Sequence, residues 1–292
     1  MEHRSISPDA QVGKVSLTVG DLPGALAFYT DVLGLSQMRV DGNSALLAAA
    51  GGEPLLELVE QPGARPRPAR STGLYHFAIL VPDRWNLACV LRALVNADWP
   101  LQGASDHGVS EALYLADPDG NGIEVYRDRP REEWPRRHGQ LQMATDPLDL
   151  QGVLSELDRR TAPWEGMPPA TRMGHVHLHV ADLQQAHGFY VDLLGFDVMQ
   201  RYGASALFVS AGGYHHHIGL NTWAGIGAPP PPAGSAGLRY FTVAMPDDDT
   251  PAELAQRVTA AGVSVQEQAD GWYLQDGSGN GIRLAAAGHA VG

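Results

Sequence analysis

The sequence predicts an α+β fold made of four similar modules, each a strand, a helix and a further set of strands. Two sets of repeated signatures predict this organisation. At an offset of 161 positions, the chain repeats Asp21-Leu22, Phe28-Tyr29, Leu33-Gly34 and Gly51-Gly52. At an offset of 159 positions, it repeats the turn residues Asp117, Gly120, Asn121 and Gly122. Such self-similarity indicates that the two halves are tandem copies. A residue that is present in only one of the copies therefore calls for a functional explanation.

The first module, residues 10–60, shows the expected order of elements. The β-branched, alternating stretch 13–19 predicts a strand, and Asp21 is expected to cap the helix that follows. The apolar stripe of that helix is Leu22, Leu26, Tyr29 and Leu33. Stretches 45–50 and 55–59 then predict strands separated by a glycine pair.

The remaining modules repeat this order. In the module 73–128, a strand at 74–81 precedes a helix at about 84–97, and the turn 117–122 joins two later strands. The other modules are 173–222 and 237–287. Proline-rich joints lie inside each half, and the sequence therefore predicts two domains, 10–128 and 173–287, connected by a linker at 129–172.

Composition favours a packed protein and disfavours several partners. Hydrophobic residues make up 44% of the 292 positions and charged residues 18%, which suits a sizeable core. The formal charge of −13 argues against nucleic acid or an anionic membrane as partner. The sequence shows no apolar run typical of a signal peptide or a membrane span, so a cytoplasmic location is expected. With one cysteine, Cys89, no disulfide forms within the chain.

The four modules, with an Asp-Leu after the first strand and a Phe-Tyr in the helix, resemble the vicinal oxygen chelate superfamily. That superfamily includes glyoxalase I, type I extradiol dioxygenases and fosfomycin-resistance proteins. The segments 73–77 and 120–124 are most similar to bacterial catechol-2,3-dioxygenase-type members. The resemblance implies that the modules pair so that their curved sheets enclose a metal ion. Proteins of this fold often form homodimers. The resemblance by itself does not imply a particular reaction.

In that superfamily, the metal ligands lie on the first strand of a module, seven residues before the Asp that begins the helix, and on the last strand. The corresponding first-strand positions are Lys14, His76, His175 and Tyr240. The corresponding last-strand positions are Glu57, Glu124, Ile218 and Arg283.

Which residues meet depends on which modules pair. Pairing the second with the third would assemble His76, Glu124 and His175. Two histidines and a carboxylate hold non-haem Fe(II) and leave positions open for a substrate and O₂. Pairing in chain order would instead place Lys14 and Glu57 beside His76 and Glu124. That alternative resembles glyoxalase I, although the Lys14 ammonium would repel a divalent metal.

The histidine-rich segment 214–220 is expected to be a strand whose His216 faces the site. It resembles the His-His strand of extradiol enzymes, which implies that His216 is an acid/base. The alternative is that these histidines lie on the protein surface and have no catalytic role. The resemblance also implies that Tyr114 hydrogen-bonds a substrate oxygen, but its repeat counterpart Tyr273 allows a structural role. His107, in a loop, could contact the substrate or be merely solvated.

The resemblance therefore implies a metal-dependent extradiol dioxygenase that cleaves a small catechol-like aromatic substrate with O₂. Fe(II) is the expected metal, and Mn(II) or Zn(II) would suit the same ligands. Two alternatives stay open. One is a glyoxalase-like lyase or isomerase that uses Glu57 as a ligand. The other is a protein that binds a small molecule without converting it, as resistance proteins do.

Overall fold

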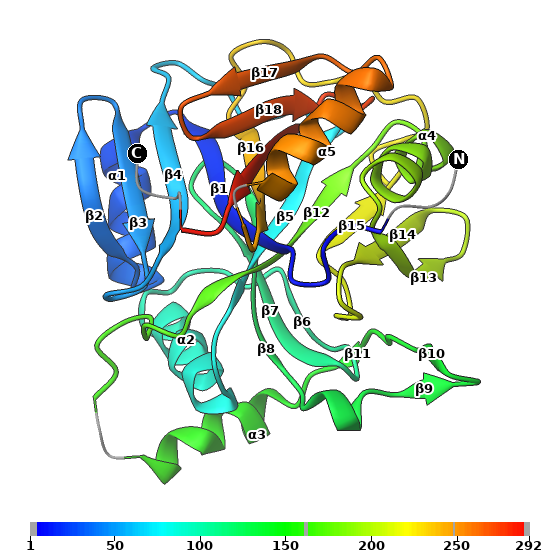
Figure 1. The fold of residues 1–292 in the computed structure, drawn as a ribbon. Helices are drawn as coiled ribbons and strands as arrows, with labels where there is room; N and C mark the ends of the chain where they lie inside the picture. Colours follow the sequence, from blue (N-terminus) through cyan, green and yellow to red (C-terminus); the bar gives the residue numbers. More distant parts are fainter. Residues whose placement is uncertain (1–4, 161–162, 248, 289–292) are drawn as a thin grey trace.

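The computed structural model describes residues 5–160, 163–247 and 249–288. Most of its strands form two large mixed sheets (Figure 1). The eight-stranded sheet has the order β17 (Val265–Gln268), β18 (Gly271–Gln275), β19 (Gly281–Ala286), β16 (Gly237–Met245), β1 (Gln11–Val19), β4 (Pro54–Glu60), β3 (Ser44–Ala48) and β2 (Ser36–Asp41).

The nine-stranded sheet has the order β11 (Asp146–Pro147), β6 (Gly103–Asp106), β7 (Ser110–Ala116), β8 (Gly122–Asp128), β5 (Gly73–Leu80), β12 (Arg172–His179), β15 (Ile218–Asn221), β14 (Ala206–Ser210) and β13 (Asp197–Tyr202). A two-stranded ribbon pairs β9 (Arg136–Arg137) with β10 (Gln140–Leu141).

The order of strands shows how the modules pair. In every module the first and last strands are parallel neighbours: β1 with β4, β5 with β8, β12 with β15, and β16 with β19. Between modules, β5 pairs antiparallel with β12 and β1 pairs antiparallel with β16. The second and third modules thus share one sheet, as the pairing that assembles two histidines and a glutamate requires. The first and fourth share the other.

The helices lie beside the sheets (Figure 1). They are α1 (Leu22–Ala27) with a π-helical continuation η1 (Phe28–Val32), α2 (Arg84–Asn96), η2 (Arg131–Glu133), α3 (Leu150–Ser155), η3 (Glu156–Arg159), α4 (Leu183–His187) with η4 (Gly188–Leu193), and α5 (Asp249–Ala260). The Asp83 and Asp182 carboxylates cap α2 and α4. The expected cap by Asp21 is wrong: Asp21 occupies the N-cap position of α1, but its side chain makes no capping hydrogen bond. Oε1 of Glu60 accepts the Leu22 amide proton.

The repeated signatures connect consecutive modules across the two sheets. The Tyr29 hydroxyl donates to Asp117 at 2.8 Å, and in the second half Tyr190 donates to Asp276 at 3.0 Å. All four side chains are buried. A buried hydrogen bond to a carboxylate stabilises the fold more than a neutral one, so both halves keep the same tyrosine and aspartate for a structural reason.

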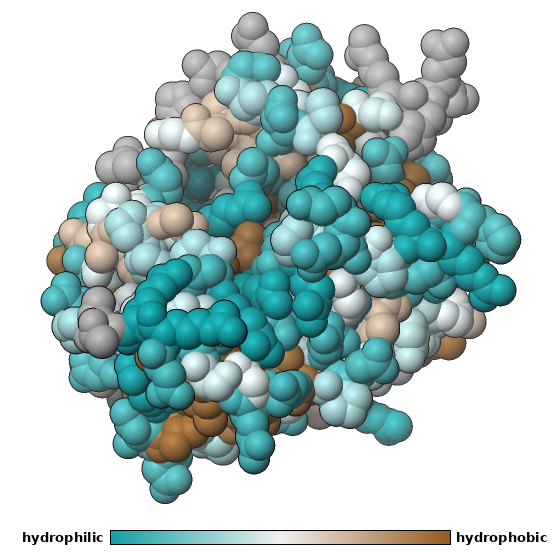
Figure 2. All heavy atoms as spheres, turned by 90° about the horizontal axis from the view of Figure 1, so that it is seen from below, coloured by the Kyte–Doolittle hydropathy of each residue, from teal (hydrophilic) through white to brown (hydrophobic). Residues whose placement is uncertain are grey.

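One apolar core extends through both sheets, whose central strands β1 and β12 pack together. The face in Figure 2 is mostly hydrophilic with scattered apolar patches, which agrees with the net charge of −13. Among the described residues, no helix combines the length and apolarity needed to cross a bilayer.

Candidate active site

The sheet formed by the second and third modules brings three residues of metal-ligating type close together. Glu124 on β8 lies beside Ala78 on β5, and Ala78 in turn lies opposite His175 on β12. His76 is two residues from Ala78 on β5 and therefore points to the same face. Because Ala78 carries only a methyl group, the side chains of Glu124, His76 and His175 can converge above it.

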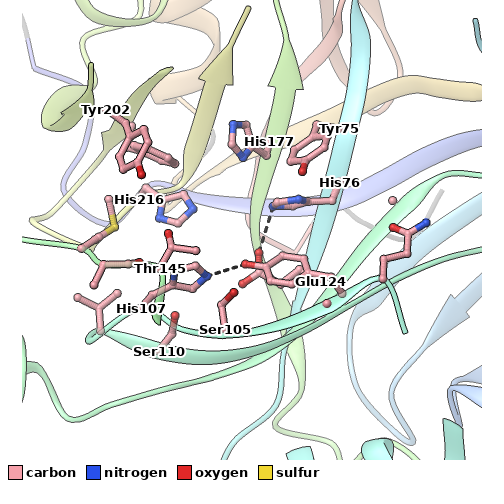
Figure 3. A pocket seen from close by; sticks show the side chains of 18 of the residues that line it. Tyr75, His76, Ser105, His107, Ser110, Glu124, Thr145, His177, Tyr202 and His216 are labelled. Carbon is pink, nitrogen blue, oxygen red and sulfur yellow. Dashed lines mark hydrogen bonds and ion pairs between the residues drawn. The ribbon is translucent and has the colours of Figure 1, made fainter. Parts of the chain in front are cut away.

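The candidate ligand atoms of these three side chains lie close together. Oε2 of Glu124 lies 3.1 Å from Nε2 of His76 and 3.1 Å from Nε2 of His175. The three candidate ligand atoms all lie within 4.8 Å of one another, and the three residues are buried. Figure 3 shows His76 directed at Glu124.

This donor set fits a divalent metal. Metal–nitrogen and metal–oxygen bonds of about 2.0–2.2 Å place neighbouring ligand atoms about 3 Å apart, which is the spacing found around Glu124. Nε2 of His76 is buried and has no hydrogen-bond partner among the described residues. A metal ion would satisfy that nitrogen.

The ionisation states also suit metal binding. Burial lowers the pKa of His175 to about 4 despite the nearby carboxylate, so this imidazole is neutral at pH 7. Burial alone would raise the pKa of Glu124, but His175 and His76 hold it well below its usual value. A neutral imidazole and an ionised carboxylate are the forms that bind metals.

The next histidines along β12 do not join this cluster. His179 bonds Asn221, whereas His177 borders the cavity above the cluster. Its ring fits because residue 219 is glycine: a Cβ there would lie 2.8 Å from the His177 ring. Nε2 of His177 is buried and has no hydrogen-bond partner among the described residues, so it is available to a ligand.

The buried histidines make the fold sensitive to acid. Burial lowers the pKa of His179 to about 4 and that of His217 to about 3, from an unfolded value of 6.5. Below pH 6.5 the unfolded chain therefore binds more protons than the folded one, and the free energy of unfolding falls as the pH falls. From these two groups we expect a loss of about 2 kcal/mol between pH 7 and pH 5.5.

Urea denaturation at the two pH values measures the combined loss from all histidines buried in this way, and His217→Gln should reduce it by about 1 kcal/mol, the share of one group. Stability that stays constant or rises between pH 7 and pH 5.5 would contradict the neutral burial of these histidines.

The segment with three consecutive histidines is only partly the expected strand. Strand β15 begins at Ile218, and the histidines form an irregular turn before it. Side-chain bonds hold this turn: Nε2 of His215 bonds Asp128 at 2.9 Å, and Nδ1 of His217 bonds Ser210 at 3.0 Å. The backbone of His217 also bonds Val209 and Val176 on the neighbouring strands. His216 borders the cavity, and its ring contacts that of His175, with the centroids 4.1 Å apart and the planes tilted by 49°.

These bonds limit which nitrogen of His216 can carry a proton. The Asp128 carboxylate only accepts hydrogen bonds, so Nε2 of His215 donates to it. Nδ1 of His215 and Nδ1 of His216 lie 2.8 Å apart. When Nδ1 of His215 accepts in this pair, His216 carries its proton on Nδ1 and its lone pair on Nε2.

Tyr114 and His107 are also brought to the cavity. Tyr114 lies beside Glu124 in the β7–β8 pair, and its hydroxyl is 2.6 Å from Nε2 of His107. Nδ1 of His107 bonds the Ala144 carbonyl, which only accepts. In the tautomer with its proton on Nδ1, Nε2 of His107 accepts from the Tyr114 hydroxyl. Burial, with the Glu124 charge, raises the pKa of Tyr114 well above 10.0. Its hydroxyl therefore stays protonated, with lone pairs free to accept.

A cavity of about 340 Å³ lies over this cluster and has the size of a small-molecule site. Figure 3 shows His107 and His216 reaching the cavity opposite His76. Sequence reasoning missed several lining residues, namely Tyr75, Met143, Thr145, Gln200, Tyr202, Phe208 and Trp223. Met143 and Thr145 come from the segment expected to be a linker. This segment borders the cavity because its strand β11 pairs with β6 and because Gln200 bonds the Met143 backbone.

Comparisons with known proteins agree with this architecture. The model of the Glyoxalase/Bleomycin resistance protein/Dioxygenase superfamily matches residues 11–125 and 172–282. The chain belongs to this superfamily. It is also 48% identical over 277 residues to a Bacillus subtilis (strain 168) protein named catechol-2,3-dioxygenase, covering 93% of this chain and 95% of that protein.

Solved structures of superfamily members share the fold. A putative dioxygenase from Bacillus subtilis superposes with a TM-score of 0.69 at 14% identity, covering 98% of this chain and 87% of that one. Glyoxalase I from Zea mays superposes with a TM-score of 0.58 at 16% identity, covering 95% and 92%. At these identities the likeness shows the fold alone.

The first and fourth modules form a second pair, whose ligand positions carry a different set of residues. Lys14 Nζ lies 3.8 Å from Glu57, which also accepts from the Tyr240 hydroxyl at 2.8 Å. Arg283 occupies the place of Glu124 and is paired with Asp270. Two buried cations would repel a metal ion from this half.

Proposed function

We propose that this protein is a metal-dependent extradiol dioxygenase, which cleaves a catechol-like aromatic ring with O₂. The observation that carries the proposal is the buried cluster of His76, Glu124 and His175 beneath a cavity that His216 also borders. Two histidines and one carboxylate are the ligand type of non-haem Fe(II) oxygenases. The catechol-2,3-dioxygenase name of the Bacillus subtilis relative supports the same reaction.

A divalent metal bound by these residues would lower the pKa of a catechol hydroxyl and hold the substrate and O₂ together. Fe(II) is the metal we propose, and the donor set also accepts Mn(II) and Zn(II). The protein would keep the ligands ready, because Glu124 stays ionised and His175 stays neutral.

His216 would serve as the acid/base. With Nδ1 of His216 donating to His215, the lone pair of His216 would lie on Nε2. It can therefore take a proton from the substrate and return it as the ring opens. His175, which contacts His216, keeps this base next to the metal ligands.

Tyr114 and His107 would position the substrate. Because the Tyr114 hydroxyl donates to His107, its oxygen can only accept from a substrate hydroxyl. His107 is anchored to the Ala144 carbonyl, so the accepting direction of Tyr114 is fixed. A positioned acceptor of this kind orients one hydroxyl of the catechol relative to the ligands.

The test is to purify the protein without air, load it with Fe(II), and follow the yellow ring-cleavage product of catechol. One metal per chain and catechol turnover are expected. Glu57→Ala should keep both the metal and the activity, because Glu57 pairs with Lys14 in the other sheet. Loss of the metal in Glu57→Ala would favour the glyoxalase-like alternative. Tight binding of catechol without turnover would favour a binding or resistance protein.

A further inference from the structure

The fourth module has a cavity of its own, which we call the second cavity. It measures about 330 Å³, close to the 340 Å³ of the catalytic cavity over the metal-ligand cluster. Tyr240 and Tyr273 line it, and the strand pairing gives them the places that His76 and Tyr114 have in the other half. Among the described residues, only the catalytic cavity lies over a cluster of metal-ligating type, so a ligand of the second cavity must be held in another way.

The phenolic protons of both tyrosines are already committed. Tyr240 donates to Glu57 at 2.8 Å, and Tyr273 donates to Asp270 at 2.9 Å. Burial, together with the carboxylates that they face, raises the pKa of both tyrosines above 10.0, so both hydroxyls stay protonated at neutral pH. Because a protonated phenol has one proton to donate, each oxygen can only accept from a further group. A ligand that bonds these oxygens therefore needs a donor such as a hydroxyl.

Arg239 adds a positive charge to this lining. It is exposed, lines the second cavity and forms no ion pair within the described part of the chain. Strand β16 shifts its register against β1 at this residue, and such a bulge re-aims a side chain. The charge of Arg239 acts on Glu57, the acceptor of the Tyr240 proton. A guanidinium in this position can bind a carboxylate through two parallel hydrogen bonds.

The surroundings of the second cavity carry a surplus of positive charge. The charged groups that act on the buried Lys14 are Glu57, Arg283, Asp270 and Arg39. Together with Lys14 and Arg239, they amount to four cations and two carboxylates. The whole chain has a net charge of −13, so this surplus is local, and it favours an anionic ligand.

The rest of the lining suits an aromatic ring. Val263, Leu274 and Ile282 line the cavity with apolar side chains. The rings of Tyr240 and Tyr273 meet edge to face, with their centroids 5.1 Å apart. Aromatic and apolar surfaces of this kind pack well against another ring, and the volume is that of a small-molecule site.

We propose that the second cavity binds a small aromatic hydroxy acid, whose carboxylate pairs with Arg239 and whose hydroxyl donates to the Tyr273 oxygen. Tyr273 is the more accessible of the two tyrosines, because it is partly exposed whereas Tyr240 is buried. The apolar side chains would enclose the ring between these two ends. This site needs neither the metal nor ring cleavage, so it stands or falls separately from the proposed function.

Isothermal titration calorimetry of the Fe(II)-loaded full chain tests the binding. The titration is done without O₂ and with saturating catechol, so that the catalytic cavity is occupied. We expect one equivalent of 4-hydroxybenzoate to bind. Benzoate lacks the hydroxyl and phenol lacks the carboxylate, so each should bind at least about threefold more weakly. No binding of 4-hydroxybenzoate at millimolar concentration, or equal binding of all three compounds, would overturn the proposal.

Two arginine variants show which cavity holds the acid. Arg239→Gln should weaken the binding of 4-hydroxybenzoate by about tenfold or more, because a charge-assisted hydrogen bond is lost. Arg201→Gln is the matched control, since Arg201 is also exposed and lies between Gln200 and Tyr202, which line the catalytic cavity. It should leave the affinity unchanged. Weaker binding in Arg201→Gln with unchanged binding in Arg239→Gln would place the acid in the catalytic cavity and overturn the proposal.

Tyr273→Phe separates the two ends of the ligand. It should weaken the binding of 4-hydroxybenzoate by about three- to tenfold and leave that of benzoate unchanged, because only the hydroxy acid uses the phenolic oxygen. Arg239→Gln should weaken the binding of both compounds. Asp270 keeps its pair with Arg283 in the Tyr273 variant, so the charge network around the cavity is retained. An equal loss for both compounds in Tyr273→Phe would contradict the role assigned to this oxygen.

Discussion

Replacing His76 with alanine should strip the protein of metal and of ring-cleaving activity. Nε2 of His76 lies 3.1 Å from Glu124 and has no other partner among the described residues, so the alanine variant leaves a two-ligand site. Loss of a residue that only orients a ligand costs about 10–100-fold in metal affinity, and loss of a ligand itself should cost more. Metal analysis after dialysis, together with catechol turnover, measures both effects.

The matched control is Tyr240→Phe. Tyr240 occupies the position of His76 in the fourth module, where it bonds Glu57. This variant removes a buried hydroxyl from the metal-free half and should leave the metal content unchanged. Full metal occupancy in His76→Ala, or metal loss in Tyr240→Phe, would contradict the proposed site.

Replacing His216 with glutamine should slow the reaction and spare the metal. General acid–base catalysis contributes about 10²–10⁴-fold to a rate, so kcat should fall by that amount. The metal content should stay at the natural level, because His216 contacts His175 without belonging to the ligand cluster. Steady-state kinetics with catechol and elemental analysis of the same sample separate the two effects.

His217→Gln serves as the control for this variant. His217 is a neighbour in the same turn, but it bonds Ser210 and does not line the cavity. Its replacement should change stability more than kcat. A His216→Gln enzyme with unchanged kcat would contradict the acid/base role, and one without metal would indicate a structural role.

The repeated signatures explain why the fold could be predicted from the sequence. Tyr29 and Asp117, with their copies Tyr190 and Asp276, form the same buried contact in both halves. Residues kept in both copies thus mark the scaffold. Residues found in one copy only mark the candidate site, as with Glu124, which Arg283 replaces in the other half.

Other parts of the site depend on contacts that no local pattern encodes. Ala78 lies in the row between Glu124 and His175 only because three strands align there. Met143 and Thr145 line the cavity because the segment after the second module folds back on its sheet. Nothing in their sequence neighbourhood indicates such a position.

Two local expectations failed. Asp21 has the right position for a helix cap, but its side chain makes no capping hydrogen bond, and Glu60 from the neighbouring strand bonds the Leu22 amide. The histidine segment was expected to be a strand, but it forms a turn in which His215 bonds the distant Asp128.

Anomalous diffraction at the iron edge from crystals of the Fe(II)-loaded protein tests the central claim most directly. We expect one peak per chain, about 2.0–2.2 Å from Nε2 of His76, Nε2 of His175 and a carboxylate oxygen of Glu124. A peak beside Glu57, or none near His76 in protein that contains stoichiometric iron, would contradict the proposed metal site.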